Sequence, residues 1–266
     1  MTTTPLVRVE RSDDGHVAEI VLDRPDALNA VSTEMAGAIA AAATEVASDA
    51  AVRCVVLRSS QDRAFCVGAD LKERNTLTDA QLVAQRPGNR AAYGGILDLP
   101  MPVVVAVEGY ALGGGFELAL AGDLVVAGEG ATVGLPEVSV GVIPGGGGTQ
   151  LLTRRVGWSR AASLVFTARR LTAAQAYALG CVDEVVPTGT AAARAREVAL
   201  GIAANSPVAL RQAKRAMRLG ADVDLRAGLE IEDACWRASA FSADRAEGVA
   251  AFVTKRTPRW PGSAIP

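Results

Sequence analysis

The sequence predicts an α/β fold in which a mixed region of strands and helices is followed by helices alone. Short apolar runs of strand length recur up to about residue 187, and amphipathic segments of helical period separate them. Beyond that point the apolar residues follow a helical period only. Strands that alternate with helices favour a core with helical crossovers. We therefore expect a core over residues 1–190 and a helical region over residues 191–266.

The first predicted elements are a β-hairpin and an amphipathic helix. Residues 7–10 and 17–22 alternate in strand fashion, and Asp14-Gly15 between them is a hairpin turn signal. Ser32 is placed to cap a helix in which apolar residues recur on one face from Met35 to position 46.

The middle of the chain predicts further strands and one interrupted helix. Apolar runs at 54–57, 103–107 and 123–127 have the length of buried strands. Residues 78–99 have helical character, but Pro87-Gly88 lies inside them. Proline lacks an N–H and clashes with the preceding turn, so we expect two helical pieces with a mobile joint.

The last third predicts mainly helices. A short helix ends at Gly180, and residues 181–186 form a small strand. Ser206-Pro207 begins a helix that Gly220 closes. Other helical faces lie around 191–202, 225–236 and 249–253. The proline-rich tail, 258–266, is expected to be poorly ordered.

Composition excludes several classes of function. The 266 residues include 27 basic and 29 acidic side chains, and aromatic residues make up only 4%. Nucleic-acid binding usually requires a basic patch and stacking platforms, so we expect no nucleic-acid partner. No apolar run approaches the roughly 20 residues that span a bilayer, and no signal pattern opens the chain. We expect a cytoplasmic protein with no membrane partner.

The cysteines and the single histidine do not suggest a metal centre. The four cysteines show no C-x-x-C spacing, and His16 lies near none of them in sequence. His16 flanks the hairpin turn, where a structural or solvated role is expected. Free thiols in a reducing compartment fit this pattern best.

The stretch 109–118, Gly-Tyr-Ala-Leu-Gly-Gly-Gly-Phe-Glu-Leu, is the strongest candidate for a functional loop. It follows an apolar strand and leads into a helix. Consecutive glycines let the backbone approach a ligand closely, and a helix start leaves N–H groups unpaired and positively polarised. Glu117 follows within one turn. Such a segment can polarise a carbonyl, although a glycine turn that merely packs a helix on a strand is an alternative.

Standard phosphate loops and catalytic triads are absent. The second glycine-rich loop, 141–150, lacks the lysine of a P-loop, and Leu118 stands where the third glycine of a dinucleotide-binding loop would be. No Gly-x-Ser-x-Gly elbow exists, and the one histidine is on the first hairpin. Acid–base chemistry therefore falls to carboxylates, lysine or tyrosine.

Two carboxylates stand in otherwise apolar segments. Glu117 lies in Phe-Glu-Leu-Ala-Leu-Ala, and Glu137 follows Pro136. Either one alone can be a satisfied structural carboxylate. Burial of such groups raises their pKa values.

Several separated motifs together resemble the enoyl-CoA hydratase/isomerase (crotonase) superfamily. They are Arg-Pro-Asp-Ala-Leu-Asn at 24–29, Ala-Phe-Cys-Val-Gly-Ala-Asp-Leu at 64–71, the stretch 109–118, Gly-Leu-Pro-Glu at 134–137, the glycines and Thr-Gln at 145–150, and Asp-Arg-Ala-Glu-Gly at 244–248 with Phe-Val-Thr-Lys at 252–255. The resemblance covers about residues 6–256. It implies a crotonase-like spiral of ββα units with a C-terminal helical region that caps the active site and mediates oligomerisation.

The resemblance also implies an activity and its residues. The substrate would be an acyl-CoA thioester whose oxygen accepts hydrogen bonds from the N–H groups of Ala69 and Gly114. Hydratases of this kind keep two glutamates, which match Glu117 and Glu137. Glu117 would activate water for attack at C3 of a trans-2-enoyl-CoA, and Glu137 would hold the water and supply a proton at C2. The backbone of Gly145 would help to orient the water.

Coenzyme A, as part of the substrate, is expected along two segments and the last helix. The implied contacts are Ala27, Leu28, Asn29, Ala69, Asp70, Leu71 and Lys72, with Phe252 and Lys255 closing over the adenine from the same or a neighbouring subunit. Either lysine can instead be a solvated surface residue. Phe116 stands where relatives often have a small residue or cysteine, which suggests a different acyl pocket.

Alternatives to hydration stay open at this point. Family isomerases work with one glutamate at the position of Glu137, so double-bond isomerisation is the second hypothesis, and RNA binding is a third that the acidic pI disfavours. The family predicts a homotrimer or a homohexamer and no separate cofactor. Acyl chain length and pathway, whether fatty-acid metabolism or another, are not determined by the sequence.

Overall fold

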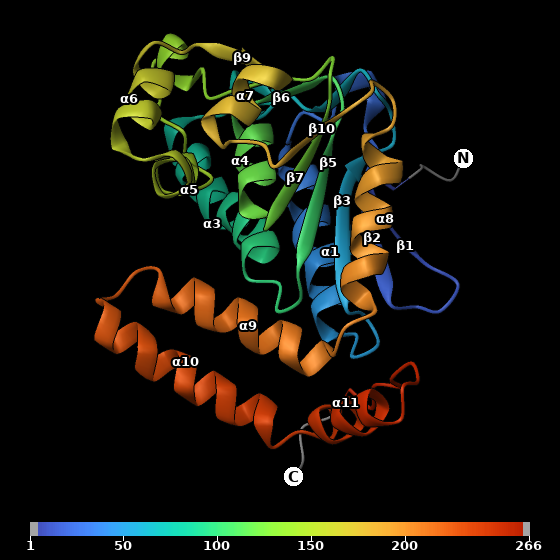
Figure 1. Ribbon diagram of the computed structural model, residues 1–266. Coiled ribbons are helices and arrows are strands. Elements are labelled where there is room, and N and C mark those ends of the chain that lie inside the picture. Colours follow the sequence, from blue (N-terminus) through green and yellow to red (C-terminus); the bar gives the residue numbers. More distant parts are fainter. Residues whose placement is uncertain (1–4, 263–266) are drawn as a thin grey trace.

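The computed structural model describes residues 5–262, which form two β-sheets surrounded by helices (Figure 1). The strands are β1 (Val7–Arg11), β2 (Val17–Leu22), β3 (Cys54–Ser59), β4 (Ala64–Cys66), β5 (Val103–Val107), β6 (Tyr110–Leu112), β7 (Leu124–Gly128), β8 (Thr132–Gly134), β9 (Arg170–Thr172) and β10 (Glu184–Val186). The α-helices are α1 (Thr33–Ser48), α2 (Leu71–Arg74), α3 (Asp79–Leu97), α4 (Gly114–Ala121), α5 (Gly148–Val156), α6 (Trp158–Phe166), α7 (Ala173–Leu179), α8 (Ala191–Ala203), α9 (Pro207–Gly220), α10 (Leu225–Ala240) and α11 (Ala243–Val253). Two 3₁₀ turns, η1 (Pro25–Ala27) and η2 (Glu137–Val140), complete the elements.

The larger sheet contains six strands in the order β1-β2-β3-β5-β7-β10. The predicted hairpin is confirmed, because β1 pairs antiparallel with β2. Every other pair in this sheet is parallel. Parallel strands need crossover connections, and these carry the helices onto the faces of the sheet.

Both faces of the larger sheet are buried. On β3, Val55 and Leu57 point to the face that packs on α1, whereas Val56 points to the opposite face. That opposite face is covered by α8 through the small side chains of Ala195 and Ala199 (Figure 1). The period of two along the strand thus divides the core into two layers, as expected for a sheet with helices on both sides.

The smaller sheet has the order β4-β6-β8-β9. From β3 to β8, every second strand of the chain belongs to it, and β9 is added at its edge. Successive strands β3 and β4, β5 and β6, and β7 and β8 therefore alternate between the two sheets before a helix follows. Close packing joins α4 to this sheet: a Cβ on Gly115 would lie 1.9 Å from the carbonyl oxygen of Cys66. Only glycine allows this approach.

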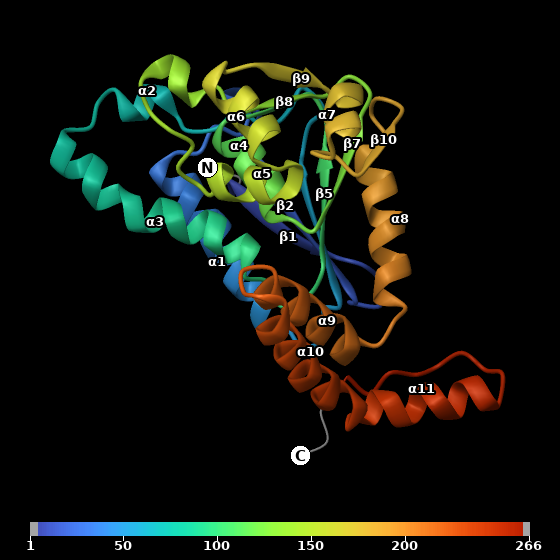
Figure 2. The ribbon, with the colours of Figure 1, turned by 60° about the vertical axis from the view of Figure 1, so that its left-hand side comes forward.

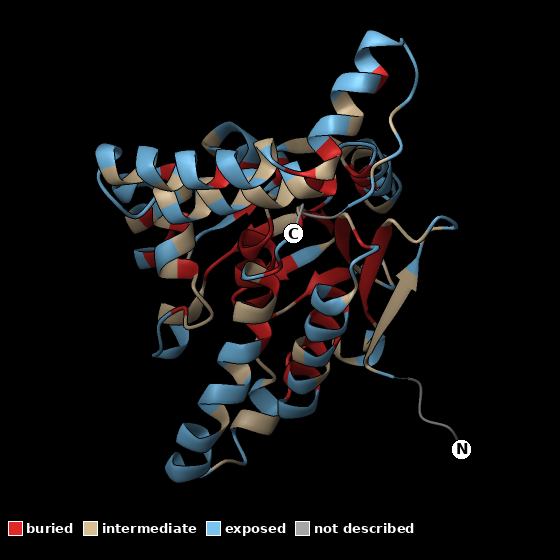
Figure 3. Cartoon of the chain, turned by 90° about the horizontal axis from the view of Figure 1, so that it is seen from below, coloured by how far each residue is buried: buried red, intermediate tan, exposed pale blue. Residues whose placement is uncertain are grey.

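The three C-terminal helices lie away from the sheets, as two views show (Figures 1 and 2). They are largely exposed, whereas the sheets are buried (Figure 3). Because α8 belongs to the core, the separate helical part begins at α9 rather than at the predicted residue 191.

The described part of the tail is held in place, against the expectation of poor order. The indole Nε1 of Trp260 donates to the carbonyl oxygen of Ala204 at 2.7 Å. The N–H of Gly262 donates to buried Asp244 at 2.8 Å. The expectation for residues 263–266 lies outside the described residues.

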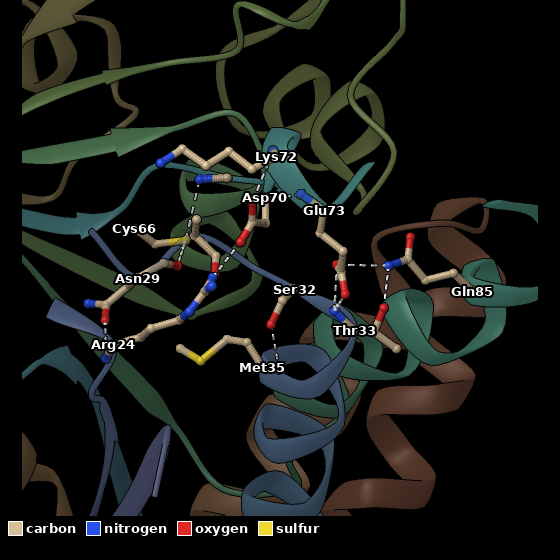
Figure 4. A network of polar contacts seen from close by, with 12 residues as sticks. Arg24, Asn29, Ser32, Thr33, Met35, Cys66, Asp70, Lys72, Glu73 and Gln85 are labelled. Atoms are coloured by element: carbon tan, nitrogen blue, oxygen red, sulfur yellow. Dashed lines mark hydrogen bonds and ion pairs between the residues drawn. The ribbon is translucent and has the colours of Figure 1, made fainter. Parts of the chain in front are cut away.

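Helix α3 is continuous, so the predicted break at Pro87-Gly88 is wrong. The half before the proline is fixed at two points. A reciprocal capping box joins Thr78 and Gln81 at the start. Two residues before the proline, Gln85 donates to Thr33 at 2.6 Å (Figure 4). These bonds offset the single helical hydrogen bond that proline removes.

Within residues 5–262, no helix is long and apolar enough to cross a bilayer. The same residues contain no group of three or more His, Cys, Asp or Glu side chains arranged to hold a metal ion. All four cysteines are buried and unbridged.

Candidate functional site

A cavity of about 990 Å³ lies between helices α2 and α3, the β6–α4 junction, and the segment from Pro136 to Leu151. Its volume is at the upper end of the range for small-molecule sites. It is lined by Ala69, Gly114, Glu117, Glu137 and Gly145, the five residues that the sequence predicts to be catalytic. The fold therefore gathers residues from four separate motifs around one cavity.

The backbone segments of Ala69 and Gly114 lie side by side. Gly68, which precedes Ala69, has a φ of +89°, and a Cβ there would lie 2.8 Å from the carbonyl oxygen of Leu112 and 3.0 Å from the nitrogen of Gly114. Any other residue at position 68 would force the segments apart. Neither Ala69 nor Gly114 donates its N–H to another group among residues 5–262. Two peptide donors are thus available at the cavity wall.

Gly114 also benefits from its place in a helix. It is the first residue of α4, and Gly113 before it has a φ of +52°. The N–H groups of a first helical turn have no partner within the helix and carry a partial positive charge. An oxygen that gains negative charge near Gly114 would be stabilised by this terminus.

Glu117 lies one turn into α4 and is buried, with 2% of its surface exposed. Its Oε1 accepts hydrogen bonds from the N–H groups of Gly146 and Gly148, each at 2.7 Å. Burial raises the pKa of Glu117, while these bonds oppose the rise. The second glycine-rich loop therefore acts as a cradle for this carboxylate.

Glu137 faces the same cavity from η2, and its carboxylate accepts fewer hydrogen bonds than that of Glu117. Its carboxylate lies over Gly113, where a Cβ would be 3.0 Å from Oε1. Its Oε2 is buried and has no hydrogen-bond partner among the described residues. Burial and the nearby charge of Glu117 raise the pKa of Glu137 to about 7. Glu137 thus presents an unsatisfied carboxyl oxygen in the cavity.

Two residues of α3 complete the site and were not expected from the sequence. A Cβ on Gly114 would lie 2.3 Å from the hydroxyl of Tyr93, and one on Gly146 would lie 2.7 Å from its ring. Arg86 donates to the carbonyl oxygen of Gly145 at 2.7 Å. Arg86 and Tyr93 are seven positions apart and so share one face of α3. This spacing could not be used to predict the site from the sequence, because the helix was expected to break at Pro87.

Most residues predicted to contact coenzyme A lie beside the cavity and do not line it. Ala69 and Leu71 line it, whereas Ala27, Leu28, Asn29, Asp70 and Lys72 do not.

The side chains of Asn29 and Asp70 hold the protein's own loops (Figure 4). Asn29 is fully buried and bonds to Ser59 at 2.8 Å and to the carbonyl of Phe65 at 2.9 Å. Asp70 pairs with Arg24 at 2.7 Å, which lowers the pKa of Asp70. These two side chains are therefore engaged within the protein, and their predicted contact with coenzyme A stays a prediction.

Phe252 and Lys255 lie far from the cavity of their own chain. Phe252 lies in the last turn of α11 and Lys255 just after it. This helix packs on α9 and α10 at the opposite end of the molecule from α2 and α3 (Figures 1 and 2). Phe252 is 86% exposed. Phe116 is buried in the core and does not line the cavity, so its size does not shape the pocket directly.

The chain was compared with known proteins. Enoyl-CoA hydratase/isomerase is the family whose sequence model matches residues 12–263. A human relative, mitochondrial methylglutaconyl-CoA hydratase, is 40% identical over an alignment of 268 positions that covers 98% of this chain and 79% of the relative. The human mitochondrial enoyl-CoA hydratase domain-containing protein 2 is 40% identical over 260 residues, which are 96% and 89% of the two chains.

Solved structures agree with these relatives. The enoyl-CoA hydratase from Bacillus anthracis superposes with a TM-score of 0.94 at 39% identity, and the match covers 97% of this chain and 100% of that one. The crotonase-like fold expected from the motifs is thereby confirmed. The cavity, the paired glutamates and these likenesses lead to one conclusion: the chain belongs to the enoyl-CoA hydratase/isomerase family.

Proposed function

We propose that the protein is an enoyl-CoA hydratase, which adds water reversibly to a trans-2-enoyl-CoA to give a 3-hydroxyacyl-CoA. The observation that supports this most is the pairing of Glu117 with Glu137 beside two free peptide donors in one cavity. Hydration needs an oxyanion site, a base that takes a proton from water and an acid that gives a proton to carbon. These groups supply all three. No separate cofactor is required for this chemistry.

The N–H groups of Ala69 and Gly114 bind the thioester oxygen and stabilise the enolate that forms when water attacks. One such donor contributes about 2.7–4 kcal/mol to lowering the barrier in a comparable site. The donors lie on backbone held by close glycine packing, so little reorganisation is needed during the reaction.

Glu117 acts as the base in this proposal. Its carboxylate removes a proton from water as the water oxygen forms a bond to C3. Two hydrogen bonds from the peptide N–H groups of Gly146 and Gly148 favour its ionised form and fix its direction. Gly145 takes part by carrying this loop, which Arg86 ties to α3.

Glu137 acts as the acid. With a pKa of about 7 it retains its proton in a large share of molecules at neutral pH, and it delivers that proton to C2 as the enolate collapses. The proton taken from water by Glu117 balances the one given by Glu137, so the sum is addition of one water across the double bond.

The test is substitution of each carboxyl by its amide. In Glu117→Gln and Glu137→Gln, hydration of a trans-2-enoyl-CoA, followed by loss of the conjugated thioester absorbance, should fall by about 10²–10⁴-fold. Binding of a saturated acyl-CoA, measured by calorimetry, should persist, because the peptide donors remain. Full hydration by either variant refutes the assignment. If Glu117→Gln still moves the double bond of a 3-enoyl-CoA at an undiminished wild-type rate, isomerisation is the better description.

We further propose that the protein works in the cytoplasm as a homotrimer or homohexamer. Four unbridged, buried thiols support a reducing compartment. The exposed apolar side chains of α9 to α11 support assembly.

A further inference from the structure

We infer that this site selects 2-enoyl thioesters whose acyl chain ends in a carboxylate, which Arg90 and Asn89 of α3 bind. This rests on the proposed hydration and adds the class of acyl chain. It follows from three features of the cavity: its charge, the arrangement of one face of α3, and an unpartnered polar atom.

The cavity has an excess of positive charge. Four arginines line it, Arg74, Arg86, Arg90 and Arg170, against two carboxylates, Glu117 and Glu137. None of these arginines forms an ion pair with another residue of the described chain. A purely aliphatic acyl chain offers nothing to a guanidinium group, whereas a carboxylate can accept two parallel hydrogen bonds from it.

One face of α3 carries the polar groups toward the reacting centre. Arg86, Asn89, Arg90 and Tyr93 are spaced by three, one and three residues, which places them on one side of the helix. Tyr93 abuts Gly114 at the proposed oxyanion site. Asn89 and Arg90 are about one turn from Tyr93, roughly 5–6 Å along the helix axis. A carboxylate a few carbons beyond the thioester would reach them.

Asn89 is a polar side chain on this face of α3 that lacks a hydrogen-bond partner. Its Oδ1 is buried and accepts no hydrogen bond within residues 5–262, and a buried polar atom without a partner is costly. Since nothing fixes the amide, it can rotate by half a turn and direct its NH₂ group into the cavity. Arg90 is exposed at the rim, and its side chain forms no hydrogen bond with any other described residue. The two side chains together offer donors for one carboxylate.

A phosphate of coenzyme A is the competing ligand for these arginines. Every acyl-CoA carries the same phosphates, so loss of a phosphate contact would weaken all substrates equally. Loss of a contact to the acyl carboxylate would weaken only substrates that have one. The ratio between two matched substrates therefore separates the two explanations.

Binding is measured first, because it does not require turnover. Glutaryl-CoA and valeryl-CoA have acyl chains of five carbons and differ in ending with a carboxylate or a methyl group. Calorimetry should show that glutaryl-CoA binds about tenfold more tightly or better, as expected for a charge-assisted pair. Equal affinity, or tighter binding of valeryl-CoA, overturns the inference.

Kinetics with variants then tests the residues. The ratio of kcat/KM for glutaconyl-CoA to that for trans-2-pentenoyl-CoA should fall about tenfold in Arg90→Met. Arg90→Lys, which keeps the charge, should recover part of the ratio. Arg160→Met is the matched control, since Arg160 is exposed on α6 and does not line the cavity, and the ratio should be unchanged. An equal loss for both substrates in Arg90→Met assigns the arginine to the phosphates and overturns the inference.

The two proposals fail in different ways. If neither unsaturated substrate is hydrated but glutaryl-CoA binds more tightly than valeryl-CoA, the hydratase assignment is wrong and the selection stands. If pentenoyl-CoA is hydrated and the carboxylate brings no advantage, the hydratase assignment stands and the selection is wrong.

Discussion

Glu117 and Glu137 are chemically identical side chains that the protein places in different environments. Glu117 accepts two peptide hydrogen bonds, which favour its ionised form against the effect of burial. Glu137 has a buried oxygen without a partner and a pKa raised to about 7. Burial raises the pKa of both carboxyls, but only Glu117 has peptide hydrogen bonds that oppose the rise. In the proposed reaction, this difference in hydrogen bonding distinguishes the base from the acid.

The pH dependence of hydration follows from this difference. In the proposed mechanism hydration requires protonated Glu137, a form that predominates below a pH of about 7 and is lost above it. It also requires ionised Glu117, which is lost in acid. We therefore expect kcat/KM for hydration to fall about tenfold per pH unit on the alkaline side of about 7, and to fall again in acid. Initial rates across the pH range at constant ionic strength provide the measurement. A rate that stays level well past neutrality would contradict the role of Glu137.

The site residues that could be predicted from the sequence are those in or beside glycine-rich segments. Gly114 and Glu117 could be found because consecutive glycines before a helix are rare and have a physical meaning. Tyr93 and Arg86 could not, because their contribution depends on how α3 crosses the glycine loops, and side chains so far apart in sequence meet only through tertiary packing. The raised pKa values were expected in direction only, since partners set the size of the shift.

Among the elements, α4 depends most on one residue. A methyl group at position 115 would overlap the carbonyl oxygen of Cys66. Gly115→Ala should therefore lower the free energy of unfolding by about 1–3 kcal/mol or more and displace the oxyanion site. Gly37→Ala is the control, because Gly37 lies in α1 with open space around it, and alanine there should raise stability by up to about 1 kcal/mol. Chemical denaturation measures both, and equal stability of the two variants would refute the packing argument.

Helix α3 shows where local rules mislead. Proline and glycine together predict an interruption, yet contacts from Gln85 to Thr33 and the capping box hold the helix through them. The strands β6 and β9, three residues each, were also not predicted. Their pairing comes from neighbouring strands in the smaller sheet rather than from an apolar pattern of their own. Long elements with a clear period, such as α1 and the predicted hairpin, were confirmed.

At the scale of the whole molecule, the C-terminal helices expose several large apolar side chains. Met217, Leu225, Trp236, Phe241 and Phe252 are each more than half exposed. A patch of this kind on a protein surface usually marks an interface. If the protein assembles, Phe252 and Lys255 can approach coenzyme A only in the cavity of another copy, because α11 is distant from its own (Figure 2).

Assembly can be tested with a charge at this patch. Phe252→Glu should shift the mass measured by light scattering toward that of the monomer, since burying a carboxylate at an interface is costly. The Km for acyl-CoA should rise with it. Leu200→Glu on the outer face of α8 is the control, and its mass should be unchanged. A Phe252→Glu protein with wild-type mass and Km would show that α11 is not part of an interface.

The order of strands in the larger sheet has a consequence for synthesis on the ribosome. Reading across the sheet from β1 to β10, each strand comes later in the chain than its neighbour. The sheet can therefore grow by addition at one edge as the chain emerges, and no strand has to insert between two that are already paired. The growing edge is a row of unpaired peptide groups that can pair with other chains. The edge of β7 stays open until β10 docks on it and leaves an edge strand of only three residues. Nascent chains that stop short of residue 184 therefore carry the greatest risk of aggregation.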